Sequence, residues 1–350
     1  MSRPERLQAI EELQKERGGT VVVSYITSTR PNFESQMAMD VIPRMFRHLS
    51  AISSPADETK IDLFIHSNGG EGTVPWRLVT LLREYCSELC VLVPNRAFSA
   101  ATLTALGADR VIMHPMGMLG PTDPTVANAF NPADPNQPGQ VLGISVEDVA
   151  SYIALVREDV GIRHEDELIQ AFSVLADKIH PLALGNVKRS TLQSRMMGEK
   201  LLKRRKDGPL TDHAIGEIVR KLTSELYFHG HPINRDEARD DVGLTFVEDA
   251  TPAVADLMWN LFELYAAEMK LDDEFMPVQE AIAQNPLPVP SDPSMMPSVS
   301  LQLDPIKSVY VESQTGCDVF SSSFEITLRR DFSGVYNGQV GLLGRGWDEE

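Results

Sequence analysis

The sequence has few cysteines and a deficit of basic side chains. Its three cysteines, Cys86, Cys90 and Cys317, are odd in number and lack a framework spacing, so reduced thiols in the cytoplasm are expected. The 50 Asp and Glu residues outnumber the 32 Lys and Arg residues, which gives a formal net charge of -18. So little positive charge argues against a nucleic-acid groove and against docking on anionic lipid.

Long apolar segments and nucleotide-binding loops are also missing. No stretch of about 18 apolar residues occurs, so no helix is expected to span a membrane. The N-terminus is charged and amphipathic and lacks the apolar run of a signal peptide. No P-loop motif is present. His229 and His231 alone cannot establish a metal site, and we expect neither a metal nor a cofactor.

The first third of the chain alternates between apolar runs typical of strands and periodic segments typical of helices. This alternation indicates βαβ crossovers and a mainly parallel, covered sheet, which is an α/β fold. The predicted strands are Thr20–Ile26, Lys60–His66, Leu89–Val93 and Arg110–His114, and the predicted helices are Arg6–Arg17, Met37–Leu49, Val74–Cys86 and Ser99–Gly107.

A long loop, a helical region and a β-rich tail follow. The loop Gly117–Pro138 is rich in Pro, Asn and Asp, and the proline-rich segment 285–297 cannot hold a helix. Between them, helical periodicity predicts Ser145–Asp159, Glu165–Lys178, Pro181–Lys206, Thr211–Leu226 and Ala253–Lys270. The tail predicts short strands at Ser298–Leu303, Ser308–Glu312, Phe324–Arg329 and Gln339–Leu343.

The segment Ile61–Thr125 carries residues suited to acyl-transfer chemistry. Gly69 and Gly70 end a predicted strand, where they leave backbone N–H groups open to a developing oxyanion. Ser99 begins a helix of small residues, so its Oγ lies near the positive end of the helix dipole. A serine at this position is equally typical of a helix N-cap, and the residues alone leave both interpretations open.

Three motifs in this segment resemble the ClpP/crotonase superfamily. They are, in order, SNGG, AFSAATLTALGAD and MHPMGMLGPTDP, and the later stretch HGHPINRDEARDDVGLTFVED resembles the superfamily's closing element. The likeness is closest to the serine dehydrogenase proteinase (SDH proteinase) family and to SppA-like signal peptide peptidases, and it spans roughly Thr20–Asp249. It implies a repeated ββα spiral with a mainly parallel sheet and the activity of a serine peptidase.

The resemblance also implies roles for individual residues. Ser99 matches the nucleophile, Gly69 and Gly70 match the oxyanion turn, and the Ala100 N–H matches the second oxyanion donor. The histidine base of ClpP has no counterpart here, because its position falls near 120–122, where no side chain is a base. SppA-like enzymes instead use a lysine from a later helix, and burial lowers the pKa of such a lysine enough for it to accept the serine proton.

Lys178 and His229 are the candidates for the base. Lys178 ends a predicted helix with apolar neighbours, and His229 directly precedes the closing element, near the third catalytic position of the family. Another base, or no base at all, stays open as an alternative. Lys188 and Lys200 belong to a basic helix face that is typical of solvated surface.

Three further polar residues near the motifs are predicted to be structural. His114 and His66 lie at strand ends, where packing is the usual role of a histidine. Asp123 stands in a Pro-Thr-Asp-Pro loop and is interpreted as a turn residue.

Three functions compete for this sequence. The first is an ATP-independent serine endopeptidase that cleaves a peptide or protein substrate through Ser99. The second is a crotonase-like acyl-CoA enzyme, which is disfavoured because no carboxylate lies in the serine helix or its turn. The third is a catalytically silent scaffold or partner-binding subunit, a role that the proline-rich segment and β tail would suit.

The predicted division of the chain has four parts. Residues 1–19 form an N-terminal helix, 20–284 a ClpP/crotonase-like peptidase domain, 285–297 a Pro-rich linker and 298–350 a small C-terminal β appendage. Related chains form trimers or stacked rings, so the resemblance implies a homo-oligomer with Ser145–Leu202 or Ala253–Lys270 in its contacts.

Overall fold

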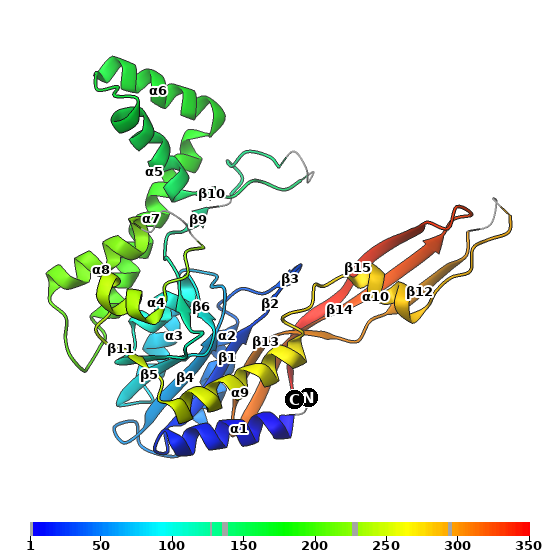
Figure 1. Cartoon of the computed structure of the whole chain (residues 1–350), viewed down its shortest axis with the longest axis horizontal. Helices are drawn as coiled ribbons and strands as arrows, with labels where there is room; N and C mark the ends of the chain where they lie inside the picture. Colours follow the sequence, from blue (N-terminus) through cyan, green and yellow to red (C-terminus); the bar gives the residue numbers. More distant parts are fainter. Residues whose placement is uncertain (1–2, 127, 135–138, 226–229, 293–295) are drawn as a thin grey trace.

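A computed structural model describes residues 3–126, 128–134, 139–225, 230–292 and 296–350. Figure 1 shows a central sheet with helices on both faces and two arms that project from it, one helical and one made mainly of strands. The two ends of the chain lie side by side beside α1.

One sheet of nine strands organises the described part of the chain. Its strands follow the order β11-β7-β5-β4-β1-β13-β14-β12, and β15 pairs with β14. The pairs among the first five strands in this order are parallel, and the remaining pairs are antiparallel. The strands are β1 (Val21–Thr27), β4 (Lys60–His66), β5 (Glu88–Val93), β7 (Arg110–Met113), β11 (Val247–Asp249), β12 (Ser298–Gln302), β13 (Ile306–Ser313), β14 (Gly316–Arg330) and β15 (Tyr336–Glu349).

The parallel part of the sheet is buried on both faces, as its continuous apolar runs predicted. In β4, Leu63 packs in a core with the helices of one face, whereas Phe64 packs in a second core with the helices of the other. The first face carries α2 (Val41–Ser50), α3 (Val74–Arg83), α4 (Ala100–Leu106) and α8 (Asp212–Ser224), and the second carries α1 (Arg3–Glu16) and α9 (Pro252–Met269). The predicted α/β class is confirmed.

The helical arm lies between the loop after β7 and α8 (Figure 1). It consists of α5 (Val146–Ala154), a π-helical turn (Leu155–Asp159), α6 (Glu165–Lys178) and α7 (Pro181–Leu202). The predicted helices of this region are present, but α6 has no buried residue, so it packs weakly on the rest of the chain. No helix in the described ranges is both long and apolar enough to cross a bilayer.

The C-terminal strands continue the main sheet. β13 pairs antiparallel with β1, and α10 (Pro277–Gln284) packs through Ala281 on the outer part of β14. The sequence pattern did not predict α10 or β11, and the strands that it predicted within β14 and β15 are shorter than the observed ones. β15 is mostly exposed and contains Gly338, Gly341, Gly344 and Gly346, so it lacks the alternation that marks a half-buried strand.

Short pairings gather the loops at the carboxyl end of the parallel strands. Such an edge is where open α/β sheets bind their ligands. The pairs are β2 (Thr29–Arg30) with β3 (Phe33–Glu34), β6 (Arg96–Ala97) with β8 (Met118–Leu119), and β9 (Thr125–Val126) with β10 (Ile144–Ser145); a π-helical turn at Glu237–Val242 precedes β11.

Candidate active site

A glycine turn follows β4 at the carboxyl edge of the sheet. Gly69 O accepts a hydrogen bond from Met37 N–H at 2.7 Å, and Glu71 N–H donates to Met37 O at 2.9 Å. Gly69 has φ 99°, and a Cβ on it would lie 2.7 Å from Phe98 O. A Cβ on Gly70 would collide with the backbone of Met37. Both positions therefore require glycine.

Ser99 stands between β6 and the first residue of α4. Its backbone has φ 51° and ψ -110°, a conformation that L-residues rarely adopt and that costs about 1–3 kcal/mol. Its side chain makes no capping hydrogen bond to the helix. No side-chain hydrogen bond therefore supports the interpretation of Ser99 as a helix N-cap. Strain of this kind is common at functional sites, where the surrounding structure holds it.

The glycine turn and Ser99 are in direct contact. A Cβ built on Gly69 would lie 2.8 Å from Ser99 Cβ and 3.0 Å from Ala100 N. Ser67 joins the two segments, because its N–H donates to Arg96 O at 3.0 Å and its carbonyl accepts from Phe98 N–H at 2.9 Å. The structure therefore brings together the serine and the glycines that the motifs predicted.

Two amides at this junction have no acceptor among the hydrogen bonds of the described residues. Gly69 N–H donates to Ser67 Oγ at 2.9 Å and is occupied. The bonds to Met37 come from the residues on either side of Gly70, so the Gly70 N–H lies on the edge away from Met37. The Ala100 N–H is the first of α4, a position with no acceptor within the helix. These two amides can bind a developing negative charge.

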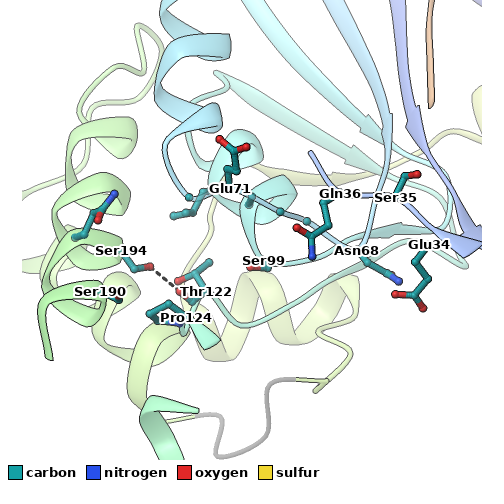
Figure 2. A pocket seen from close by; sticks show the side chains of 16 residues that line it. Glu34, Ser35, Gln36, Asn68, Glu71, Ser99, Thr122, Pro124, Ser190 and Ser194 are labelled. Carbon is teal, nitrogen blue, oxygen red and sulfur yellow. Dashed lines mark hydrogen bonds between the residues drawn. The ribbon is translucent and has the colours of Figure 1, made fainter. Parts of the chain in front are cut away.

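A cleft of about 470 Å³ opens over this junction. Figure 2 shows Ser99 between two groups of polar side chains, one from α7 and the loop after β8 and the other from the chain around β3 and the glycine turn. Ser194 Oγ donates to Thr122 O at 2.6 Å and so holds α7 against that loop. The lining is formed by Glu34, Ser35, Gln36, Asn68, Gly69, Gly70, Glu71, Gly72, Ser99, Ala100, Leu103, Thr122, Pro124, Ser190, Gln193 and Ser194.

Lys178, one of the two predicted bases, is not in this lining. Lys178 is exposed at the end of α6, in the arm that Figure 1 places away from α4. His229 lies outside the described residues, so its position relative to Ser99 is not described. Lys188 and Lys200 are exposed on α7, as expected for a solvated face, and Lys200 Nζ lies 5.5 Å from the Trp76 ring. Among the described residues, no histidine, lysine or arginine lines the cleft.

The histidines and the aspartate near the motifs lie outside the lining. His66 is buried, its Nε2 is 3.1 Å from Thr29 Oγ1, and burial and then Arg96 lower its pKa to about 3. His114 stacks on Trp259, and burial and then Arg235 lower the pKa of His114. Asp123 is buried in the loop beside the cleft.

A polar stripe on α7 is the part of the site that sequence reasoning missed. Ser190, Gln193 and Ser194 line the cleft and are spaced three and four residues apart, so they share one helix face. That spacing is visible in the sequence and could have indicated a polar helix face beside the site. His231 does not reach the cleft lining; its Nε2 lies 2.6 Å from Glu237 Oε1. No group of three or more potential metal ligands occurs among the described residues.

Comparison with known families matches the segment that carries this site. Residues 3–135 match the family of ClpP-like SDH-type serine proteinases. The matched range contains the glycine turn, Ser99 and Ala100 and ends before the helical arm.

Two curated relatives come from Methanocaldococcus jannaschii. The chain is 26% identical to uncharacterized protein MJ0137 over 285 residues, which cover 78% of this chain and 83% of the relative. It is 24% identical to uncharacterized protein MJ1495 over 266 residues, which cover 75% of this chain and 77% of that relative.

Two solved structures are more distant. A variant of the 1510-N membrane-bound stomatin-specific protease is 16% identical with a TM-score of 0.26, over 39% of this chain and 61% of that chain. A variant of ClpP1 from Listeria monocytogenes is 12% identical with a TM-score of 0.32, over 69% of this chain and 99% of that chain.

Proposed function

Since residues 3–135 match the family of ClpP-like SDH-type serine proteinases, we propose that this chain is an ATP-independent serine endopeptidase with Ser99 as its nucleophile. One observation carries the proposal. The strained Ser99 lies in contact with a glycine turn, and the two amides beside it, Gly70 N–H and Ala100 N–H, have no acceptor among the described residues. Such an arrangement suits a tetrahedral intermediate of acyl transfer.

The reaction follows from these positions. Ser99 Oγ bonds to the carbonyl carbon of the peptide while its proton passes to a general base. The carbonyl oxygen becomes negative and accepts hydrogen bonds from Gly70 N–H and Ala100 N–H. When this tetrahedral intermediate collapses, the C–N bond breaks and the base gives the proton to the leaving amine. Water then hydrolyses the ester and restores Ser99.

The base is proposed to be Lys178 or His229. Lys178 would require a neighbouring copy of the chain or a movement of the helical arm, because it is exposed at the end of α6. Lys178→Ala and His229→Ala are to be compared for kcat. The variant that lacks the base is expected to lose about 100- to 10,000-fold; wild-type rates in both variants would assign the role to another group.

A fluorophosphonate probe tests the nucleophile. The probe is expected to label the full-length chain at Ser99 and to abolish cleavage of a fluorogenic casein substrate. Ser99→Ala is expected to lose both label and cleavage. Ser50→Ala removes an exposed serine at the end of α2, outside the cleft lining, and is the matched control, which should keep both. A wild-type chain that cleaves the substrate and still does so as Ser99→Ala would refute the proposal.

The lack of a described histidine, lysine or arginine in the cleft lining favours one alternative, a catalytically silent scaffold. The same probe separates the functions. A silent site or an acyl-CoA hydratase would leave Ser99 unlabelled under conditions that label a known serine peptidase.

The location and assembly of the chain are further proposals. All three cysteines are free and buried, which is typical of a reducing compartment such as the cytoplasm. Large apolar side chains, among them Ile169, Phe172 and Val174, are exposed on α6. A homo-oligomer that buries this part of the helical arm would remove them from water.

A further inference from the structure

Ser67 is a buried hydroxyl beside the cleft with no role in the reaction described above. It directly follows β4, has no exposed surface and does not line the cleft. Its Oγ accepts one hydrogen bond from Thr27 Oγ1 at 2.8 Å and another from Gly69 N–H at 2.9 Å. Thr27 ends β1 and is also fully buried. This oxygen therefore joins the end of β1 to the glycine turn.

The bonds of Ser67 determine which amide of the turn is available. Its Oγ occupies the Gly69 N–H, so that amide cannot bind a substrate. With Gly69 O and Glu71 N–H both bonded to Met37, the chain is fixed on each side of Gly70. The Gly70 N–H is then the amide of this turn that remains for the oxyanion.

The backbone of Ser67 fixes the same turn to the nucleophile. Its N–H and carbonyl bond to Arg96 O and Phe98 N–H, in the three residues that precede Ser99. A change in the Ser67 side chain would leave these backbone bonds in place. The direction of the Gly70 amide can therefore be altered without removing the segment that holds Ser99.

We propose that Ser67 is a positioning residue for oxyanion binding: its Oγ, held by Thr27, sets the direction of the Gly70 N–H through Gly69. This inference rests on the proposed peptidase function. Ser67 touches no substrate atom in this role. Its effect belongs to the transition state, because the negative oxygen exists only there and not in the bound substrate.

Ser67→Ala tests the inference in the full-length chain. We expect kcat to fall at least tenfold while KM changes less than about twofold, since loss of a whole oxyanion donor costs about 100- to 1,000-fold. A peptide aldehyde forms a tetrahedral adduct with serine, so its Ki is expected to rise by the same factor as kcat/KM falls. Binding of a reduced-amide peptide, which forms no oxyanion, is expected to stay unchanged.

Ser313→Ala is the matched control. Ser313 is also buried, and its Oγ also accepts a backbone N–H two residues on, from Thr315, while it bonds to His48 Nδ1. It is the last residue of β13 and does not line the cleft. This variant is expected to keep the wild-type kcat and aldehyde Ki even where its thermal stability falls.

Thr27→Val provides a second test that keeps the side-chain volume and Ser67 itself. It is expected to lower kcat and to raise the aldehyde Ki by the same factor, at least threefold. A wild-type kcat and aldehyde Ki in a folded Ser67→Ala chain would overturn the inference, as would wild-type values in Thr27→Val if Ser67→Ala does not fold. In either case labelling of Ser99 in the wild-type chain would leave the peptidase proposal standing.

Discussion

At the scale of the residue, the backbone of Ser99 is the most unusual feature of the site. Its φ of 51° and ψ of -110° are near those of the first central residue of a type II′ turn, a position that glycine dominates. A serine is held there by the bonds of Ser67 to Arg96 and Phe98 and by the helix that follows. The strain is therefore maintained by contacts that extend well beyond the side chain.

Ser99→Gly is expected to stabilise the chain relative to Ser99→Ala. Both variants lose the hydroxyl, but only glycine relieves the backbone strain of about 1–3 kcal/mol. The greater flexibility of unfolded glycine takes back about 0.4–1 kcal/mol. The net gain, on the order of 1 kcal/mol, can be measured by urea unfolding. Equal stabilities of the two variants would contradict the strain that we assign to Ser99.

Gly69→Ala is expected to damage the site by a steric route. The added Cβ would meet Phe98 O at 2.7 Å and Ser99 Cβ at 2.8 Å, at a φ of 99°. We expect a loss of stability of about 1–3 kcal/mol and at least tenfold slower fluorophosphonate labelling. Gly72→Ala is the control in the same turn, because a Cβ there meets nothing within 4 Å. Equal labelling rates in the two variants would show that the contact is not needed.

At this scale the serine and the glycines could be predicted from the sequence because each lies within a short local motif, AFSAATLTALGAD and SNGG. The sequence did not predict which glycine amide is free, since that depends on Ser67 Oγ and on Met37, which lies about thirty residues earlier. Which residue acts as the base, Lys178 or His229, stays a prediction, because tertiary contacts between distant segments leave no local pattern in the sequence.

At the scale of the element, β4 carries a buried histidine directly before the glycine turn. His66 packs on Phe262, with ring centroids 4.8 Å apart. Burial, and then Arg96, lower its pKa from 6.5 to about 3. Below pH 6.5 the unfolded chain takes up a proton at this histidine, whereas the folded chain does not until about pH 3. The titration of this residue therefore leaves the stability unchanged above pH 6.5 and destabilises the folded state increasingly as the pH drops from 6.5 toward 3.

His66→Gln is expected to reduce the loss of stability between pH 7.5 and pH 5.5 by about 1 kcal/mol, since one unit of pH corresponds to at most about 1.4 kcal/mol per proton. Urea unfolding at the two pH values measures this difference. His213→Gln replaces an exposed histidine on α8 and is the control, which should alter the difference less. The same pH dependence in wild type and His66→Gln would refute the assignment.

A buried ion pair joins the N-terminal helix to the C-terminal strands. Arg6 Nε on α1 donates to Glu312 Oε2 on β13 at 2.7 Å, and Tyr265 of α9 donates to the same oxygen at 2.8 Å. Arg6→Ala would remove the closer ion-pair partner of the buried Glu312 carboxylate and leave only Arg3, at 3.9 Å, among the described residues, and breaking such a buried pair costs about 3–5 kcal/mol. We expect urea unfolding of Arg6→Ala to show a loss of folding stability of this size. Arg220→Ala removes an exposed pair with Glu217 and should leave the stability close to wild type.

The same elements explain where the sequence pattern succeeded and failed. β4 begins and ends where the pattern predicted, because it is an apolar run buried on both faces. β15 was predicted at a third of its length, because its exposed glycines and polar residues carry no period. The pairing of β13 with β1 joins residues almost 300 positions apart, and no local signal reports it.

At the scale of the whole molecule, the helical arm and the strand arm both project from the central sheet (Figure 1). The chain has a formal net charge of -18. Glu34 and Glu71 line the cleft, and the described lining contains no Lys, Arg or His. A substrate that approaches the cleft therefore meets a negative potential from both the cleft and the chain, which raises the encounter rate of cations and lowers that of anions.

We accordingly expect faster cleavage of peptides with lysine on both sides of the cleaved bond than of matched peptides with glutamate. The ratio of kcat/KM is expected to be about tenfold or more at 20 mM salt and to shrink at 0.5 M salt, where the Debye length falls to about 4 Å. Glu71→Gln and Glu34→Gln should reduce the ratio at low salt, whereas Glu217→Gln, on the exposed face of α8, should not. A ratio that is independent of salt would mean that side-chain pockets, rather than the field of the cleft, select the substrate.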